Sequence, residues 1–168
     1  MLGGGLKPLL PADIPGFDLI VFTEVIEHIN NPKQVLSHFH SLLSPGGLLF
    51  VTTLNFASLE RYVLGSNWGM IMYPEHISYY TPRTLDAVCT RCGFRAVEIF
   101  TENISLYRVV QFLNLFRKGA KFDAEGASAR AQAFVSNNSV GAGIKSVINA
   151  GLRATGSGSS LVAVYRKV

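Results

Sequence analysis

The sequence predicts an α/β fold organised around a parallel sheet. Residues 17–22, "FDLIVF", form a nearly continuous apolar run with β-branched members, which is typical of a strand covered on both faces. Residues 32–43, "PKQVLSHFHSLL", place a proline at a first helical turn and apolar residues at helical spacing behind it. "SPGG" (44–47) ends that helix, and "LLFVTTL" (48–54) predicts a second buried strand. A strand, a helix and a strand in this order predict a βαβ unit, in which the two strands run parallel.

The next stretch predicts a short helix with a loop, and then a well-marked second helix. Residues 56–82 are rich in Tyr and Met and hold the single Trp of the chain, which suits a helix followed by an aromatic loop. Within residues 81–94, Thr81 can cap a helix, Pro82 suits its first turn and Gly93 can end it.

The C-terminal part predicts two strands separated by helical segments. Residues 94–101 alternate apolar and polar side chains, as a half-exposed strand does, and residues 159–168 predict a closing strand. Residues 104–119 predict an amphipathic helix with a broad apolar face. Further helices are expected around residues 127–136 and 140–153, within a stretch rich in Ala, Gly and Ser.

Length and composition favour one globular domain. The chain has 168 residues, of which 48% are hydrophobic and 15% are charged, so it suits a packed core rather than a disordered chain. No apolar run approaches the length that spans a bilayer, and the first residues lack a signal-peptide pattern, so we expect a cytoplasmic protein. The net charge of +4 comes from scattered basic residues without an aromatic–basic motif, so we expect no nucleic-acid partner.

The two cysteines, Cys89 and Cys92, form a single C-x-x-C. Such a pair occurs in redox sites and as half of a zinc site. Neither a second C-x-x-C nor a His-x-x-x-His accompanies it. Because residues three apart share a helix face, we expect two small apolar thiols packed against the core.

Two glutamates and a histidine follow the first predicted strand. Ligands of open parallel sheets bind beyond the carboxyl ends of the strands, which is where Glu24, Glu27 and His28 stand. If a helix starts near Glu24, their spacing places all three on one helix face, where carboxylates and an imidazole can accept a proton or bind a metal ion. In the alternative, the glutamates complement the dipole of a helix start and His28 packs near residues 30–32. The stretch also differs by one residue from the H-x-x-E-H pattern of a zinc protease, which the parallel-sheet context disfavours.

Four separated motifs together resemble the C-terminal two-thirds of a class I S-adenosylmethionine-dependent methyltransferase. They are "FDLIVFTEVIEHINNPKQVL", "LLSPGGLLFVTTLN", "PEHISYYTPRTLDAVCTRCGF" and "LVAVYRKV", in the order of the family. The sequence is similar to the small-molecule type, which includes the ubiquinone-pathway O-methyltransferases. That family has a Rossmann-like sheet of seven strands, the last antiparallel. The resemblance implies that its strands four to seven are residues 17–23, 48–54, 95–101 and 160–167 in this chain.

The resemblance also implies a set of site residues and ligands. Thr23, Glu24 and Val25 would face the methionine end of the cofactor, S-adenosylmethionine. Glu24, Glu27 and His28 would be catalytic and would hold a divalent metal such as Mg²⁺ near the acceptor hydroxyl. The small-molecule acceptor would contact the residues that follow the second strand: Asn55, Trp68, His76 and Tyr79. Without that role, Asn55 is a turn former and His76 a packed loop histidine.

The chain departs from the family at its start. The Gly-rich cofactor loop and the acidic residue that holds the ribose are not found, because the glycines of residues 2–5 follow no strand. We therefore expect a single partial domain without the first three strands, composed of an irregular lead (1–16), a core (17–101), a helical insertion (102–158) and a closing strand (159–168). Such a chain is expected to be inactive alone. The alternative is a non-catalytic module that binds a partner or a second copy through its open sheet edge.

The helix expected at residues 104–119 has one main interpretation and three alternatives. It covers the sheet, and the alternatives are a lid, a dimer surface, or a peripheral membrane contact suited to a lipid-like acceptor.

Overall fold

The computed structural model describes residues 16–103 and 139–168, and the expected helices at 104–119 and 127–136 lie outside these ranges. In chain order the elements are β1 (Phe17–Thr23), η1 (Ile26–His28), α1 (Pro32–Leu42), β2 (Leu43–Leu54), α2 (Leu59–Leu64), η2 (Gly65–Asn67), α3 (Pro82–Thr90), β3 (Phe94–Glu102), α6 (Ser139–Thr155) and β4 (Ser160–Lys167). Among the described helices, none is both long and apolar enough to cross a membrane.

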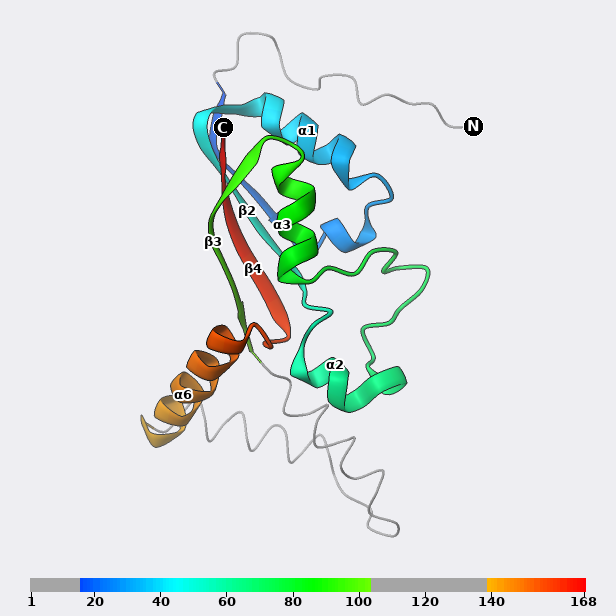
Figure 1. The fold of residues 1–168 in the computed structure, drawn as a ribbon, viewed down its shortest axis with the longest axis vertical. Coiled ribbons are helices and arrows are strands. Elements are labelled where there is room, and N and C mark those ends of the chain that lie inside the picture. The colour runs from blue at the N-terminus through cyan, green and yellow to red at the C-terminus, as the bar shows by residue number, and fades with distance from the viewer. Residues whose placement is uncertain (1–15, 104–138) are drawn as a thin grey trace.

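The strands form one mixed sheet in the order β1-β2-β4-β3 (Figure 1). β1 and β2 are parallel, as the βαβ prediction requires, and they end together, with Thr23 paired to Thr52. β4 inserts antiparallel between β2 and β3, so the C-terminal strand completes the middle of the sheet. The carboxyl ends of β1 and β2 therefore share one edge of the sheet, which leads toward α2 and the following loop.

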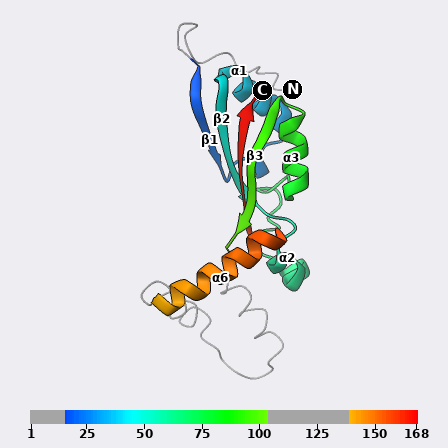
Figure 2. The ribbon, with the colours of Figure 1, turned by 60° about the vertical axis from the view of Figure 1, so that its left-hand side comes forward.

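α1 and α3 lie together on one face of the sheet (Figures 1 and 2). The Asn31 side chain accepts a hydrogen bond from the Gln34 amide at the start of α1, and Thr81 and Thr84 form a reciprocal capping box at the start of α3. Beneath them lies one apolar core, which includes Leu36, Leu49, Val51, Leu85, Cys89, Phe94, Leu161 and Tyr165. Buried Cys89 confirms the interpretation of the C-x-x-C as a core pair.

β1 forms an edge of the sheet within the described residues, and part of its surface is open. Leu19 and Val21 alternate with the core-facing residues of the strand and remain 52% and 59% exposed. The composition of residues 17–22 predicted a strand covered on both faces, so this exposure is a difference from expectation. An apolar edge strand of this kind can pair with further chain.

Two local expectations are wrong. No helix starts near Glu24: this residue has φ +49°, in the left-handed region that an α-helix excludes, and only the short 3₁₀ turn η1 follows. "SPGG" does end α1, but β2 begins at once at Leu43, so these residues belong to the strand instead of to a separate turn. The helix expected at residues 140–153 is present as α6.

Candidate functional site

Glu24 stands at the carboxyl end of β1. Its amide donates to the Thr52 carbonyl at 2.9 Å, which continues the β1–β2 pairing, and its Oε1 accepts from Thr52 Oγ1 at 2.8 Å. The residue is solvent-exposed, but its carboxyl lies against the strand end. This partial burial raises the pKa of Glu24 above its ordinary value, and the nearby Glu27 carboxylate adds to the rise, while the Thr52 hydrogen bond opposes it.

Glu27 is held by Thr53, the residue that follows Thr52 on β2. Its side chain is 2% exposed, and its Oε2 accepts from Thr53 Oγ1 at 2.8 Å. Thr52 and Thr53 are neighbours on β2, so their side chains point to opposite faces. Glu24 and Glu27 therefore bond to different threonines of β2, and their carboxyls still lie close enough to interact with each other.

The loop between α2 and α3 closes over Glu27. The backbone carbonyl of Glu27 accepts hydrogen bonds from the amides of Ile77 and Ser78, both at 3.0 Å. These bonds bring buried His76 to the site, where its ring centroid lies 4.8 Å from that of His28. One potential ligand atom from each of Glu27, His28 and His76 lies within 4.8 Å of the others.

Both imidazoles have a defined tautomer. His28 Nδ1 lies 2.7 Å from the Glu75 carbonyl, and His76 Nδ1 lies 2.8 Å from the Met70 carbonyl. A carbonyl can only accept, so each Nδ1 carries the proton and each Nε2 of the neutral ring offers a lone pair. Two imidazole nitrogens and a carboxylate are donors that suit a divalent metal, so the residues present fit such an ion. Of the three ligands that the resemblance implies, Glu24 is the one outside this cluster.

The other predicted acceptor contacts differ in their surroundings. Asn55 is fully buried: its Nδ2 donates to the carbonyls of Gly156 and Gly158, and its Oδ1 accepts from the Ala57 amide. This geometry favours the turn-forming alternative for Asn55.

The aromatic members lie nearer the cluster. The Tyr79 ring centroid is 6.4 Å from that of His76, and the Tyr79 hydroxyl accepts from the Met72 amide at 3.3 Å. Trp68 is buried, and its Nε1 donor has no partner among the described residues. Tyr79 and His76 are therefore brought together, while Trp68 packs behind them through Phe56.

The family described as a methyltransferase domain matches residues 9–99, more than half of the chain. The chain belongs to this methyltransferase family. It is 40% identical over 78 residues to the mitochondrial ubiquinone biosynthesis O-methyltransferase of Rattus norvegicus, covering 46% of this chain and 21% of the relative. It is 30% identical over 98 residues to the ubiquinone biosynthesis O-methyltransferase of Azotobacter vinelandii, covering 54% of this chain and 42% of the relative. This methyltransferase chain thus spans less than half the length of these relatives.

Solved structures share the fold. A SAM-dependent methyltransferase from Archaeoglobus fulgidus matches with a TM-score of 0.50 at 22% identity, covering 90% of this chain and 60% of that one. A possible histamine N-methyltransferase from Thermotoga maritima matches with a TM-score of 0.53 at 13% identity, covering 94% of this chain and 58% of that one. The chain thus shares the fold of these methyltransferases.

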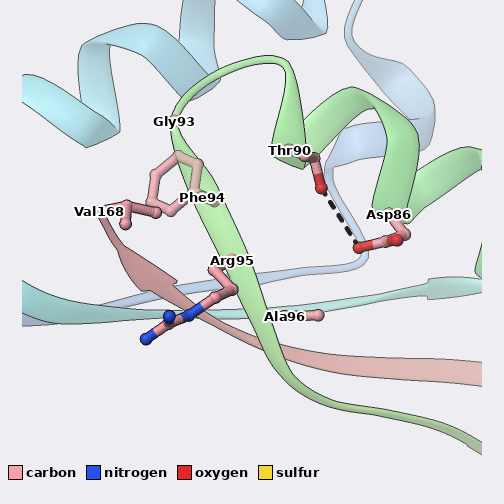
Figure 3. A pocket seen from close by; sticks show the side chains of 7 residues that line it. All are labelled: Asp86, Thr90, Gly93, Phe94, Arg95, Ala96 and Val168. Atoms are coloured by element: carbon pink, nitrogen blue, oxygen red, sulfur yellow. Dashed lines mark hydrogen bonds between the residues drawn. The ribbon is translucent and has the colours of Figure 1, made fainter.

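A pocket of about 460 Å³ lies at the opposite end of the methyltransferase sheet, where β3 begins (Figure 3). Asp86 and Thr90 of α3, joined by a hydrogen bond, line it with Phe94, Arg95 and Val168. Because Phe94 pairs with Lys167 at the start of β3, this pocket is remote from the carboxyl ends of β1 and β2. It contains none of the predicted site residues.

Sequence reasoning placed His76 at the acceptor but missed its position beside Glu27 and His28. Nearly 50 residues separate His28 and His76, and no periodicity links them. The pairing depends on backbone hydrogen bonds from the loop to the Glu27 carbonyl. Such bonds do not require particular side chains, so the sequence does not reveal them.

Proposed function

We propose that this chain is the acceptor-side part of an enzyme that transfers the methyl group of S-adenosylmethionine to a hydroxyl of a small molecule. The observation that carries the proposal is the group formed by Glu24, Glu27, His28 and His76 at the shared carboxyl ends of β1 and β2. Ligands of open α/β sheets bind at this edge. The name of the relatives, ubiquinone biosynthesis O-methyltransferase, supports oxygen as the methylated atom.

The strand arrangement supports the family numbering. We assign β1, β2, β3 and β4 to strands four, five, six and seven, because a closing antiparallel strand inserts between β2 and β3. Strands one to three would then pair at the open edge of β1. Thr23 ends β1, and Glu24 and Val25 follow it beside that edge, which suits contacts with the methionine part of S-adenosylmethionine.

Glu24 is the group that we assign as the base. Its carboxylate is accessible and is oriented by Thr52, so it can accept the hydroxyl proton of the acceptor. As that proton leaves, the acceptor oxygen bonds to the methyl carbon, and the carbon–sulfur bond breaks with its electron pair going to sulfur. Glu27 and His28 would hold a divalent ion, which supplies Lewis acidity that lowers the pKa of a bound hydroxyl. Orientation of the two reactants would contribute much of the rate.

The loop at residues 68–80 would shape the acceptor pocket. Tyr79 and His76 present rings next to the cluster, and Phe56 lies 5.3 Å from Tyr79, centroid to centroid. Aromatic walls with a few placed polar groups are typical of small-molecule sites. These surroundings favour an acceptor with a flat, apolar body that carries the reacting hydroxyl.

The test joins this chain to the N-terminal part of the Azotobacter vinelandii relative. Transfer of labelled methyl from S-adenosylmethionine to a simple phenol is measured, with the matching aniline as the control for nitrogen acceptors. We expect methylation of the phenol by the fusion and none by the 168-residue chain alone. Glu24→Gln should lower kcat by about 10²- to 10⁴-fold, the range of general base catalysis. A fusion that binds S-adenosylmethionine but methylates no hydroxyl would contradict the proposal.

A second function is favoured by the exposed apolar side chains of β1. Leu19 and Val21 on an edge strand suit a non-catalytic module that associates through this edge. Light scattering of the purified chain tests this alternative: Leu19→Lys should convert a dimer into a monomer. A chain that is already monomeric at high concentration argues against self-association.

A further inference from the structure

We infer that Arg61 binds an anionic group of the methyl acceptor, a carboxylate or a phosphate, at the end opposite the reacting hydroxyl. Arg61 would thereby select acceptors that carry a negative charge. The inference rests on the proposed function, because it names the chemical class of molecule that the same site accepts. Arg61 lies on α2 and is outside the set of site residues expected from the sequence.

The first argument is the contact of the Arg61 guanidinium with aromatic rings. Its Cζ lies 4.0 Å from the centroid of the Phe56 ring and 5.2 Å from that of the Tyr62 ring. The backbone is held as well, because the Arg61 amide donates to Ser58 Oγ at 3.2 Å. A ring attracts a cation but does not neutralise its charge. The guanidinium is therefore positioned, and its planar set of N–H donors suits a carboxylate or a phosphate.

The second argument is a comparison with Arg153 of α6, which makes the same kind of contact. The Cζ of Arg153 lies 4.0 Å from the centroid of the Phe100 ring. Arg153 also pairs with the Glu102 carboxylate at 3.0 Å. For Arg61, no carboxylate lies within ion-pair distance among the residues that the structure describes. The two cation–ring contacts thus differ in one component, the anion.

The difference in exposure makes an anion more important for Arg61. The side chain of Arg153 is 48% exposed, so water solvates much of its charge. Arg61 is half-buried, and its chain neighbour Glu60 accepts a hydrogen bond from Ser159 Oγ. A charge that is partly withdrawn from water is stabilised by an oppositely charged partner. We assign this partner to the acceptor.

The position of Arg61 connects its charge to the proposed reaction centre. The Phe56 ring lies 5.3 Å from the Tyr79 ring, and the Tyr79 ring lies 6.4 Å from the His76 ring, all between centroids. His76 belongs to the cluster at the carboxyl ends of β1 and β2. A row of rings thus leads from the cation to that cluster. An acceptor whose flat body lies along this row places its anionic group at Arg61 and its hydroxyl at the strand ends.

The first experiment measures binding to the 168-residue chain, and to the fusion described above, by titration calorimetry. The probes share a para-hydroxyphenyl ring and differ in the group at the opposite end. Two are anionic, para-hydroxyphenylacetate and para-hydroxybenzylphosphonate; para-hydroxyphenylacetamide is neutral, and tyramine is cationic. We expect an anionic probe to bind at least about 10-fold more tightly than the neutral one, and the difference to shrink as salt is added. The two anionic probes distinguish a carboxylate from a phosphate.

Variants assign the selectivity to Arg61. Arg61→Gln should weaken binding of the anionic probe by about 10- to 100-fold, as expected for hydrogen bonds to a charged group, and leave binding of the neutral probe unchanged. Arg61→Lys keeps the charge without the planar donors and should recover part of the affinity. Arg153→Gln alters the other cation–ring contact and is the matched control, which should change neither affinity. Circular dichroism confirms that each variant is folded before its titration is interpreted.

Kinetics of the fusion separate this role from the chemical step. Arg61→Gln should raise KM for the anionic acceptor by the same factor and leave kcat nearly unchanged, because Arg61 lies at the end remote from the hydroxyl. Equal affinity of the parent proteins for anionic and neutral probes, or unchanged selectivity in Arg61→Gln, would overturn the inference and leave the proposed function standing. Selective binding that depends on Arg61, but no methyl transfer by the fusion, would contradict the proposed function and leave the anion site standing.

Discussion

The core beneath α1 and α3 and the carboxyl end of the sheet bury side chains of opposite kinds. The core holds apolar residues such as Leu36, Leu85 and Phe94. The carboxyl end buries polar ones, including Glu27 and His76. Each buried apolar side chain stabilises the fold by about 1.5–3 kcal/mol, whereas a buried polar group is favourable only when it is hydrogen-bonded. The comparison separates residues that determine stability from residues that determine chemistry.

Truncating the core should give the largest change in stability. Leu85 is fully buried between α3 and the sheet, so Leu85→Ala removes contacts and leaves a cavity. We expect it to lower the free energy of unfolding by about 2–5 kcal/mol, measured by urea denaturation. Leu85→Met, which conserves volume, should cost less than about 1.5 kcal/mol. Equal losses in the two variants would show that α3 is not packed on the core as described.

Asn55 should show the next largest effect. Asn55→Ala removes three hydrogen bonds and leaves the carbonyls of Gly156 and Gly158 without their donor. We expect a loss of about 1–3 kcal/mol in the free energy of unfolding, because buried polar atoms lose their partner. In the active fusion, KM for the acceptor should stay unchanged. An intact stability with a raised KM would restore Asn55 as an acceptor contact.

A substitution at Glu27 should not lower the stability of the protein, in contrast to Asn55→Ala. In Glu27→Gln, the amide oxygen can still accept from Thr53, and the new N–H groups lie near the rings of His28 and His76, where an unprotonated ring nitrogen can accept them. In metal-free buffer we expect the variant to be as stable as the parent, or more stable by about 1 kcal/mol, the net value of one hydrogen bond. Urea denaturation curves of the variant and the parent check this prediction.

Denaturation curves recorded with added metal test the functional role of Glu27. Mg²⁺, the expected ion, should raise the midpoint of the parent and leave that of Glu27→Gln unchanged, because only the parent retains the carboxylate that we propose as a metal ligand. A destabilised Glu27→Gln that still responds to Mg²⁺ would place Glu27 in the core rather than in the site.

The contrast between the two regions also explains what the sequence could predict. α1 was predictable from the first-turn proline, Pro32, and the helical spacing of apolar residues behind it. α3 was predictable because Thr81 caps its start and Gly93 adopts φ +87° after its end. The parallel pairing of β1 and β2 followed from the βαβ pattern, and the antiparallel last strand from the family resemblance.

The site was only half predictable. The residues Glu24, Glu27 and His28 stood out because they follow a buried strand. Their supposed common helix face was wrong, because pairing of the Glu24 amide with Thr52 continues the strand register and a positive φ then turns the chain. His76 reached the cluster through long-range backbone hydrogen bonds, which residue patterns do not encode.

Removing a buried hydroxyl from the core should have little effect on stability. Tyr165 is fully buried, and its hydroxyl has no hydrogen-bond partner among the described residues, although the weakly polar thiol of Cys89 lies near it. Burial accordingly raises the pKa of Tyr165 above its ordinary value. Tyr165→Phe should change the free energy of unfolding by less than about 1 kcal/mol, in the stabilising direction, because it removes a desolvated polar atom. A clear loss of stability in denaturation would mean that this hydroxyl is satisfied.

The cysteine pair tests the packing of the core without any substitution, because alkylation of its thiols can be followed in the folded protein. Burial raises the pKa of the Cys89 thiol to about 12, so at pH 8 almost none of it is the reactive thiolate. Cys92, two residues after the end of α3, is only half-buried, and its thiol lies 3.8 Å from the Lys33 carbonyl. Iodoacetamide at pH 8, followed by mass spectrometry, should therefore modify Cys92 first and Cys89 only when urea unfolds the chain. Equal labelling of both in the native state would show that the core under α3 opens readily, and would remove the contrast in packing between the two regions.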